Sequence, residues 1–100
     1  MKADDFVQIA RSFTGVAEVP HFDRRAFKAR RIFATLAPDE CSGNIFLTPE
    51  DQTLALELYP ETISRIPNRW GFRGWTCMIL DAADPSTARH LLRLAWQASS

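Results

Sequence analysis

The sequence predicts a single α+β domain spanning residues 1–100, with helices at its start, middle and end covering one face of a mostly antiparallel sheet. Two observations carry this. Apolar residues recur with helical spacing near both ends of the chain, and between them lie short strand-like runs separated by turn residues. One hundred residues with 46% hydrophobic content suffice for one compact core. We expect a sheet of about four to six strands.

An amphipathic helix is expected over residues 4–13. Asp4 is placed to cap its start, and Gly15 suits a left-handed stop after its end. Its apolar residues recur at i, i+3, i+4 and i+7 and are Phe6, Ile9, Ala10 and Phe13.

The following segment predicts three extended stretches. Residues 18–22 form the first, and Pro20 favours a place at a sheet edge because it lacks an amide donor. Residues 26–29 and 32–36 then pair around an arginine-bearing turn, and Pro38 ends this pair of strands. Alternation in the strand would place Phe27 and Ala29 on one face and Lys28 and Arg30 on the other.

The second half predicts a short strand over residues 45–47 and then a helix. Thr48 caps the helix, with Pro49 in its first turn, and Pro60 stops it. The apolar side chains that we expect it to bury are Leu54, Ala55 and Leu58.

Residues 60–69 are expected to be irregular, and 75–81 form the clearest strand. Asp84 and Pro85 open a last helix. One face of that helix carries Ala88, Leu91, Leu92, Ala95 and Trp96.

Bulk features favour a cytoplasmic location. The acidic stretch 1–5 has no apolar core of a signal peptide, and no run approaches the ~18 apolar residues of a membrane span. Cys41 and Cys77 are the two cysteines; their separation predicts neither a disulfide framework nor a zinc site.

Charge is balanced overall but segregated along the chain. Twelve basic and twelve acidic residues give zero net charge, while residues 39–61 contain acids and no Lys or Arg. One basic cluster comprises Arg24, Arg25, Lys28, Arg30 and Arg31, and a second comprises Arg65, Arg69 and Arg73. Such clusters are either solvated faces or local positive fields that contact phosphates.

The segment Trp70 to Thr76 concentrates two tryptophans and two glycines. In one interpretation Trp75 starts a core strand and Trp70 packs over a sheet edge, while Gly71 and Gly74 shape the turn. In the other, Trp70 and Phe72 line a shallow groove and stack on a base, a ring or a partner side chain.

Catalytic signatures are not found. No phosphate-binding loop, nucleophile elbow, paired carboxylate site or metal motif is present, and His21 and His90 have no nucleophile beside them in sequence. We therefore expect a protein that is not an enzyme, with no cofactor and no metal.

The order of motifs resembles the MmcQ/YjbR family of small bacterial proteins. The resemblance covers nearly the whole chain. Its motifs are Gly15-Val16-x-Glu18-x-Pro20-His21-Phe22, Ala26-Phe27, Ile32–Leu36, Thr48-Pro49-Glu50, Trp70-Gly71-x-x-Gly74-Trp75-Thr76 and the closing leucine-rich helix. It implies a two-layer fold akin to secretion-chaperone-like domains, with a curved antiparallel sheet. It also implies a DNA-binding role, since the family's fold is likened to a double-wing motif.

Carried over by position, one wing falls on residues 24–31 and the other on residues 69–73. The chain departs from the family's commonly glycine-rich turn by having Arg30-Arg31 there. The leading hypothesis is a binding module that contacts the phosphate backbone of DNA through Arg24, Arg25, Lys28, Arg30, Arg31, Arg69 and Arg73.

The alternative is a protein-interaction or small-ligand domain. Its site would be an apolar groove formed by His21, Phe22, Trp70 and Phe72. Either hypothesis is compatible with a monomer or with a homodimer formed through an uncovered strand edge, and neither involves a membrane.

Overall fold

Six strands form one curved antiparallel sheet in the computed structural model, which describes residues 1–99. The spatial order is β1-β2-β3-β4-β6-β5. The elements are α1 (Ala3–Arg11), β1 (Ala17–His21), β2 (Arg24–Lys28), β3 (Ile32–Leu36), β4 (Ser42–Phe46), α2 (Pro49–Leu58), β5 (Ile63–Arg65), α3 (Arg69–Phe72), β6 (Trp75–Ile79), a 3₁₀ turn (Leu80–Ala82) and α4 (Pro85–Ser99). The predicted α+β class is confirmed.

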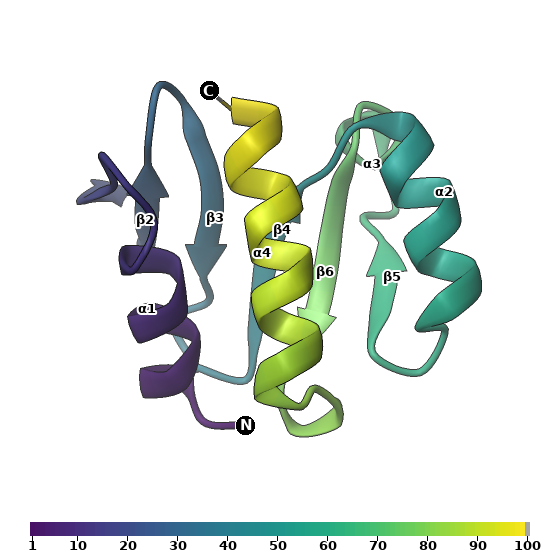
Figure 1. Ribbon diagram of the computed structural model, residues 1–100, viewed down its shortest axis with the longest axis horizontal. Coiled ribbons are helices and arrows are strands. Elements are labelled where there is room, and N and C mark those ends of the chain that lie inside the picture. The colour runs from purple at the N-terminus through teal and green to yellow at the C-terminus, as the bar shows by residue number, and fades with distance from the viewer. Residues whose placement is uncertain (100) are drawn as a thin grey trace.

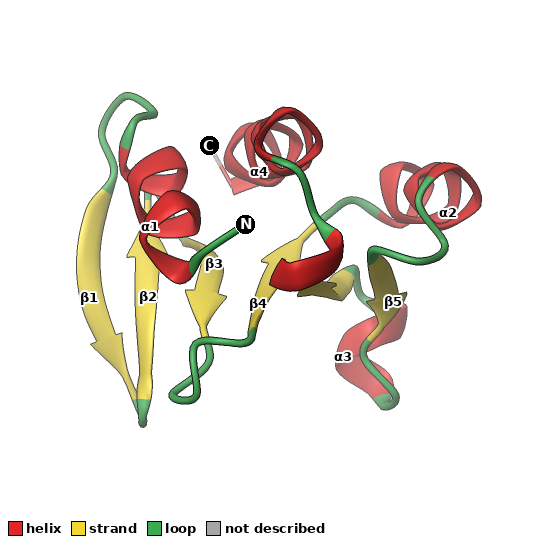
Figure 2. Cartoon of the chain, turned by 90° about the horizontal axis from the view of Figure 1, so that it is seen from below, coloured by secondary structure: helices red, strands yellow, loops and turns green. Residues whose placement is uncertain are grey.

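Three helices cover one side of the sheet. In Figure 1, α4 lies across the middle strands, with α1 and α2 on either side of it. Figure 2 shows α3 on the opposite side of the sheet, where the turn between β1 and β2 also projects. That second side is therefore open between these two features.

The core lies between the sheet and its helical layer. Its largest fully buried side chains include Phe6, Phe27, Phe33, Ile45, Met78, Leu91 and Leu92. The rings of Phe6 and Phe27 meet edge to face at 6.3 Å, which is a favoured aromatic geometry. Burying these side chains from α1, the sheet and α4 holds the two layers together.

Helix α1 is shorter than expected. It begins after Lys2 rather than at Asp4 and ends at Arg11, before Phe13. The ring of Phe13 instead stacks on Trp96 of α4, with centroids 5.4 Å apart. Gly15, with a φ of 78°, lies in the loop after the helix rather than directly at its end.

Strand boundaries differ from the expected ones because pairing partners decide them. The expected strand 26–29 is β2 (Arg24–Lys28), with a register shift against β3 between Phe27 and Lys28. Phe27 and Ala29 pack on the core and Lys28 and Arg30 are exposed, as the alternation predicts. The expected strand 45–47 begins earlier, as β4 (Ser42–Phe46). The expected strand 75–81 ends at Ile79. The edge position of β1 is confirmed.

The expectation that residues 60–69 are irregular is wrong. Residues Ile63–Arg65 form β5, which pairs with β6, and α3 begins at Arg69. A three-residue strand is too short to show an alternating pattern, so only its long-range pairing reveals it.

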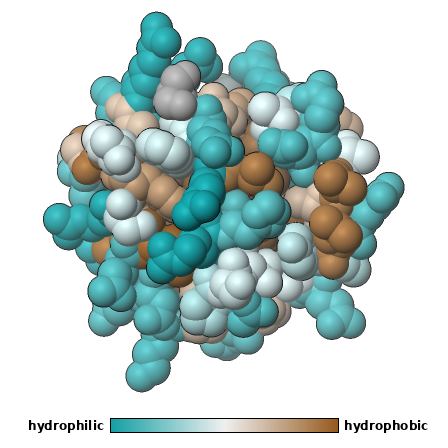
Figure 3. Space-filling view, viewed as in Figure 1, coloured by the Kyte–Doolittle hydropathy of each residue, from teal (hydrophilic) through white to brown (hydrophobic). Residues whose placement is uncertain are grey.

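Helix α2 begins at the expected Thr48 cap, whose hydroxyl accepts a hydrogen bond from the Asp51 amide. Its buried face is not the expected one. Ala55 is buried, but Leu54 and Leu58 are 55% and 58% exposed. Figure 3 shows the corresponding brown apolar surface over α2. The buried face instead carries Gln52, whose amide bonds to residues beneath the helix.

Helix α4 matches the expected apolar face. Ala88, Leu91, Leu92 and Ala95 are fully buried. The Thr87 amide donates to Asp84 Oδ1 before the helix. The hydrogen bonds that Asp84 accepts from the amide and the hydroxyl of Thr87 hold the pKa of its carboxyl below the ordinary value. A strong 3.6-residue period with a capping residue predicts an element reliably.

Candidate functional site: an aromatic groove on the open face

A groove of about 490 Å³ crosses the side of the sheet away from α4. We call it the open-face groove. One wall is the β1–β2 turn with His21 and Phe22, and the other carries Trp70 of α3. Thr35 of β3 and Asn44 of β4, directly paired in register, lie between these walls. The groove is therefore assembled by sheet pairing from segments far apart in the sequence.

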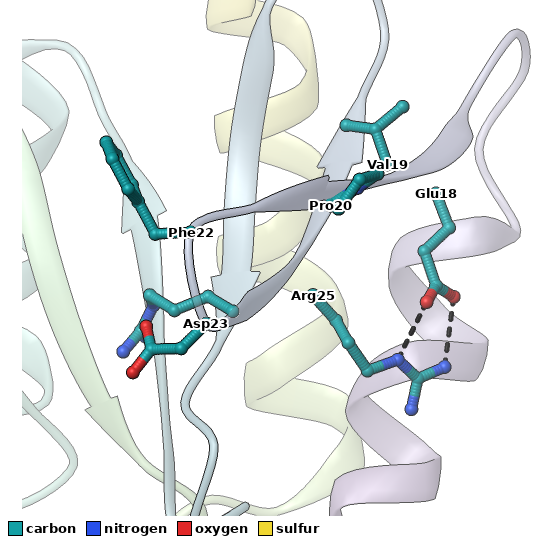
Figure 4. A pocket seen from close by; sticks show the side chains of 7 residues that line it. Glu18, Val19, Pro20, Phe22, Asp23 and Arg25 are labelled. Atoms are coloured by element: carbon teal, nitrogen blue, oxygen red, sulfur yellow. Dashed lines mark hydrogen bonds and ion pairs between the residues drawn. The ribbon is translucent and has the colours of Figure 1, made fainter.

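The hairpin wall is built on an unusual backbone. Phe22 adopts a φ of 58°, in the left-handed region that non-glycine residues rarely occupy. Its side chain is 94% exposed, and its ring lies 4.8 Å from that of His21. Figure 4 shows Phe22 pointing away from the Arg25–Glu18 pair of the same hairpin. Such strain is characteristic of functional positions.

Arg24 brings a positive charge to the groove. Its Nε donates to Thr35 Oγ1 at 2.8 Å, and Thr35 is itself 4% exposed. Its Nη2 is buried and has no hydrogen-bond partner among residues 1–99. Buried donors of this kind are rare, because leaving one unpaired costs free energy.

The opposite wall presents the indole of Trp70, which is 46% exposed. The guanidinium of Arg73 lies 5.0 Å from its centroid and that of Arg69 lies 5.7 Å away. Asn68 Oδ1 accepts from the Trp70 amide and caps the start of α3. Trp75 lines the groove as well, with its ring 5.6 Å from Phe46.

Gln52 secures this wall from the helical side of the sheet. Its Nε2 contacts Gly71 O at 2.9 Å, Thr76 Oγ1 at 3.0 Å and Trp75 O at 3.2 Å. Its Oε1 accepts from Arg65 Nε. One buried amide thus ties α2 to α3 and β6, and positions Trp70 and Trp75 indirectly.

Gly71 within α3 and Gly74 in the turn before β6 both stand where only glycine fits. A Cβ at Gly71 would overlap the carbonyl oxygen of Ile66, and one at Gly74 would overlap that of Leu47. Gly74 also has a φ of 122°. Close approach of backbones here sets the position of Trp70 against the sheet.

The YjbR family model matches residues 11–98 of the chain. The chain belongs to the YjbR family. No curated protein matches it. The crystal structure of Deinococcus radiodurans protein DR2400, which has a DUF419 domain, is similar with a TM-score of 0.77. The two share 18% identity over 97% of this chain and 77% of that one, so this likeness concerns the fold.

The structure brings three of the expected groove residues of this YjbR protein together. His21, Phe22 and Trp70 all line the open-face groove. Phe72 does not line it. Its ring is 73% exposed and lies 5.4 Å from the Arg65 guanidinium. Trp70 and Phe72 are two positions apart on helix α3, and side chains at this spacing point to different sides of a helix.

The predicted basic wing of the YjbR fold is divided between surfaces. Arg24 lines the groove, whereas Arg25 alternates to the other face and forms a two-pronged ion pair with Glu18 at 2.7 and 2.9 Å. The hydrogen bond from Arg25 lowers the pKa of Glu18 below its ordinary value. Lys28, Arg30 and Arg31 are exposed at the other end of β2.

Sequence reasoning misses the groove role of Arg24 and the contributions of Thr35, Asn44 and Trp75. Thr35 and Trp75 belong to motifs quoted above and Arg24 to the first basic cluster, but no local pattern brings them together, because their proximity follows from the order of strands. Among residues 1–99 the groove lining contains no carboxylate and no thiol. Its chemistry consists of aromatic faces, amides, a hydroxyl, one imidazole and one guanidinium.

Proposed function

We propose that this protein is a non-enzymatic binding module, and that its open-face groove holds a partner presenting a flat apolar group. The observation that carries the proposal is the joint exposure of Phe22 and Trp70 on two walls of one groove. Burying apolar surface yields about 25 cal/mol per Å², so covering two aromatic side chains supplies substantial affinity. A volume near 490 Å³ falls in the range of small-molecule sites.

The composition of the lining supports binding rather than catalysis. In the described chain His21 is the one imidazole of the lining, and no lining carboxylate or thiol stands beside it. General acid–base or nucleophilic chemistry commonly pairs such a group with another.

The proposal is tested with 2-naphthamide, a neutral planar probe. Titrated into ¹⁵N-labelled protein, it should shift the Trp70 and Trp75 indole signals and the Asn44 side-chain signal. Trp70→Ala and Phe22→Ala should each weaken binding severalfold, whereas Phe72→Ala removes an exposed ring of the same helix and should leave binding unchanged. An equal effect of Phe72→Ala, or shifts confined to other surfaces, would contradict the proposal.

Contact with the phosphate backbone of DNA is a second candidate, favoured by Lys28, Arg30 and Arg31. These three are exposed, and no acidic residue occurs between positions 24 and 38. Arg25 is occupied by Glu18, so a reduced set of cations remains available. Neutralising three phosphates gives a slope of log K against log salt of roughly −3.

A labelled 20–30 base-pair duplex distinguishes the two candidates. Backbone binding should show this salt slope and collapse in Arg30→Glu/Arg31→Glu. The matched control Arg89→Glu/Arg93→Glu changes the same charge on exposed positions of α4. Absence of binding at low salt, or equal loss in both double variants, would retire this candidate. Groove binding should instead depend little on salt and respond more to Trp70→Ala than to Arg30→Glu.

A further inference from the structure

We infer that the open-face groove takes a small planar aromatic carboxylate, whose anionic group pairs with Arg24. This inference rests on the proposed function and adds the chemical class of the ligand. It starts from the two neighbouring arginines of β2, which have opposite surroundings.

Arg25 forms an ion pair with Glu18, whereas Arg24 forms none with any residue in the described part of the chain. Two nitrogens of Arg25 bond to the two carboxylate oxygens of Glu18. Arg24 has one neutral partner, Thr35, which accepts from Nε, and its buried Nη2 lacks a partner. The lining of the groove supplies no acid within the described chain. A ligand anion would provide both the missing acceptor and the missing negative charge.

The single charge of the lining favours a carboxylate over a phosphate monoester. Arg24 is the only guanidinium that lines the groove, among the residues that the structure describes, and no lysine joins it. A carboxylate carries one negative charge and two acceptor oxygens, which one guanidinium can match. A phosphate monoester carries up to two charges and three acceptor oxygens, and would need further donors.

The neighbouring surface favours an aromatic ring attached to that carboxylate. Phe22 and Trp70 contribute exposed aromatic rings from two walls, and Ile32 and Ile66 add apolar lining. Asn44 offers an amide within the groove for a polar substituent. Nη2 has almost no exposed surface, so contact with a ligand requires the Arg24 guanidinium or its neighbours to shift. Rearrangements of this size at binding surfaces are common.

The test compares two probes of one shape, 2-naphthoate and 2-naphthamide, on the unmodified protein at pH 7. We expect 2-naphthoate to bind with a Kd below about 1 mM and at least about tenfold more tightly than 2-naphthamide. Both should perturb the indole signals of Trp70 and Trp75. The comparison requires no variant, so it remains decisive if a substitution at Arg24 impairs folding.

Variants locate the anion site. Arg24→Gln should abolish the preference for 2-naphthoate, while the matched control Arg25→Gln on the same strand should preserve it. Arg24→Lys retains the charge without the planar fork and should retain part of the preference.

Each remaining result has a separate meaning. Equal binding of both probes with groove shifts would overturn the carboxylate inference and leave the groove proposal standing. Failure of both probes to perturb the groove would overturn both. Tighter binding of adenosine monophosphate than of 2-naphthoate would replace the carboxylate by a phosphate ligand and so overturn the inference. Equal loss in Arg24→Gln and Arg25→Gln would also overturn it.

Discussion

At the scale of single residues, Gly74 shows how a backbone contact positions the aromatic wall. Its φ of 122° is unfavourable for side-chain-bearing residues, and a Cβ would overlap Leu47 O. We expect Gly74→Ala to lower the free energy of unfolding by at least about 3 kcal/mol, through strain and displacement of backbone together. Denaturant unfolding measures this change.

Gly15 is the control for Gly74, because it also has a positive φ but has free space where a Cβ would stand. Its φ is 78°, yet a Cβ there would meet nothing within 4 Å. Gly15→Ala should therefore cost about 1 kcal/mol from backbone strain alone. Equal losses at the two glycines would show that close approach at Gly74 contributes nothing.

Gln52 is a residue whose role the sequence does not reveal. It is 1% exposed. Its amide donates hydrogen bonds to Gly71, Trp75 and Thr76 and accepts one from Arg65. We expect Gln52→Ala to destabilise the protein by about 3 kcal/mol, because it leaves a cavity and removes the four side-chain hydrogen bonds of Gln52. Thermal and denaturant unfolding check this.

Gln8, exposed on α1, is the matched control, and Gln8→Ala should change stability by less than about 0.5 kcal/mol. The same Gln52 variant should also broaden or shift the Trp70 indole signal, since α3 loses its anchor. An unchanged Trp70 signal together with unchanged stability would refute the anchoring role.

At the scale of elements, the β1–β2 hairpin carries a pH-dependent contribution. The pKa of Glu18 is lowered in the folded state by its hydrogen bond with Arg25. Stability from this pair is therefore fully present above the ordinary Glu pKa and lost as pH falls through the lowered value. The pair is solvated, with side-chain exposures of 45% and 28%, so it contributes about 0.5 kcal/mol or less.

The measurement is the difference in unfolding free energy between the unmodified protein and Glu18→Gln. It should be small and positive at pH 7, diminish with added salt, and disappear towards pH 2. A difference that grows as the pH falls would contradict the assigned sign.

Elements also show why local signals predict some segments and not others. The start of α2 and the apolar face of α4 follow from capping residues and a 3.6-residue period, which lie within one segment. The strand β5 has three residues and exists through its pairing with β6. Whether these residues form a strand is decided by their pairing with β6, which the sequence around β5 does not reveal.

At the scale of the whole molecule, the groove couples segments that are distant in sequence. Phe22 and Trp70 lie on separate walls of one groove. In a double-mutant cycle of Phe22→Leu and Trp70→Leu, we expect their effects on 2-naphthoate binding to be coupled by about 0.5 kcal/mol or more. Their effects on stability should be additive, because both side chains are exposed. Additive effects on binding would indicate that the two rings do not share one ligand.

The sequence by itself determined the α+β class, the YjbR family and the capped, periodic helices, since these signals are local or are carried by ordered motifs. It also placed His21, Phe22 and Trp70 among the groove candidates. Only the tertiary structure decided that Arg24 joins them, that Arg25 is paired with Glu18, and that Phe72 lies outside. The physical reason is that these features depend on contacts between residues far apart in the sequence. Such contacts set the order of the strands and the buried hydrogen bonds of Gln52, and a pattern within one segment carries no information about them.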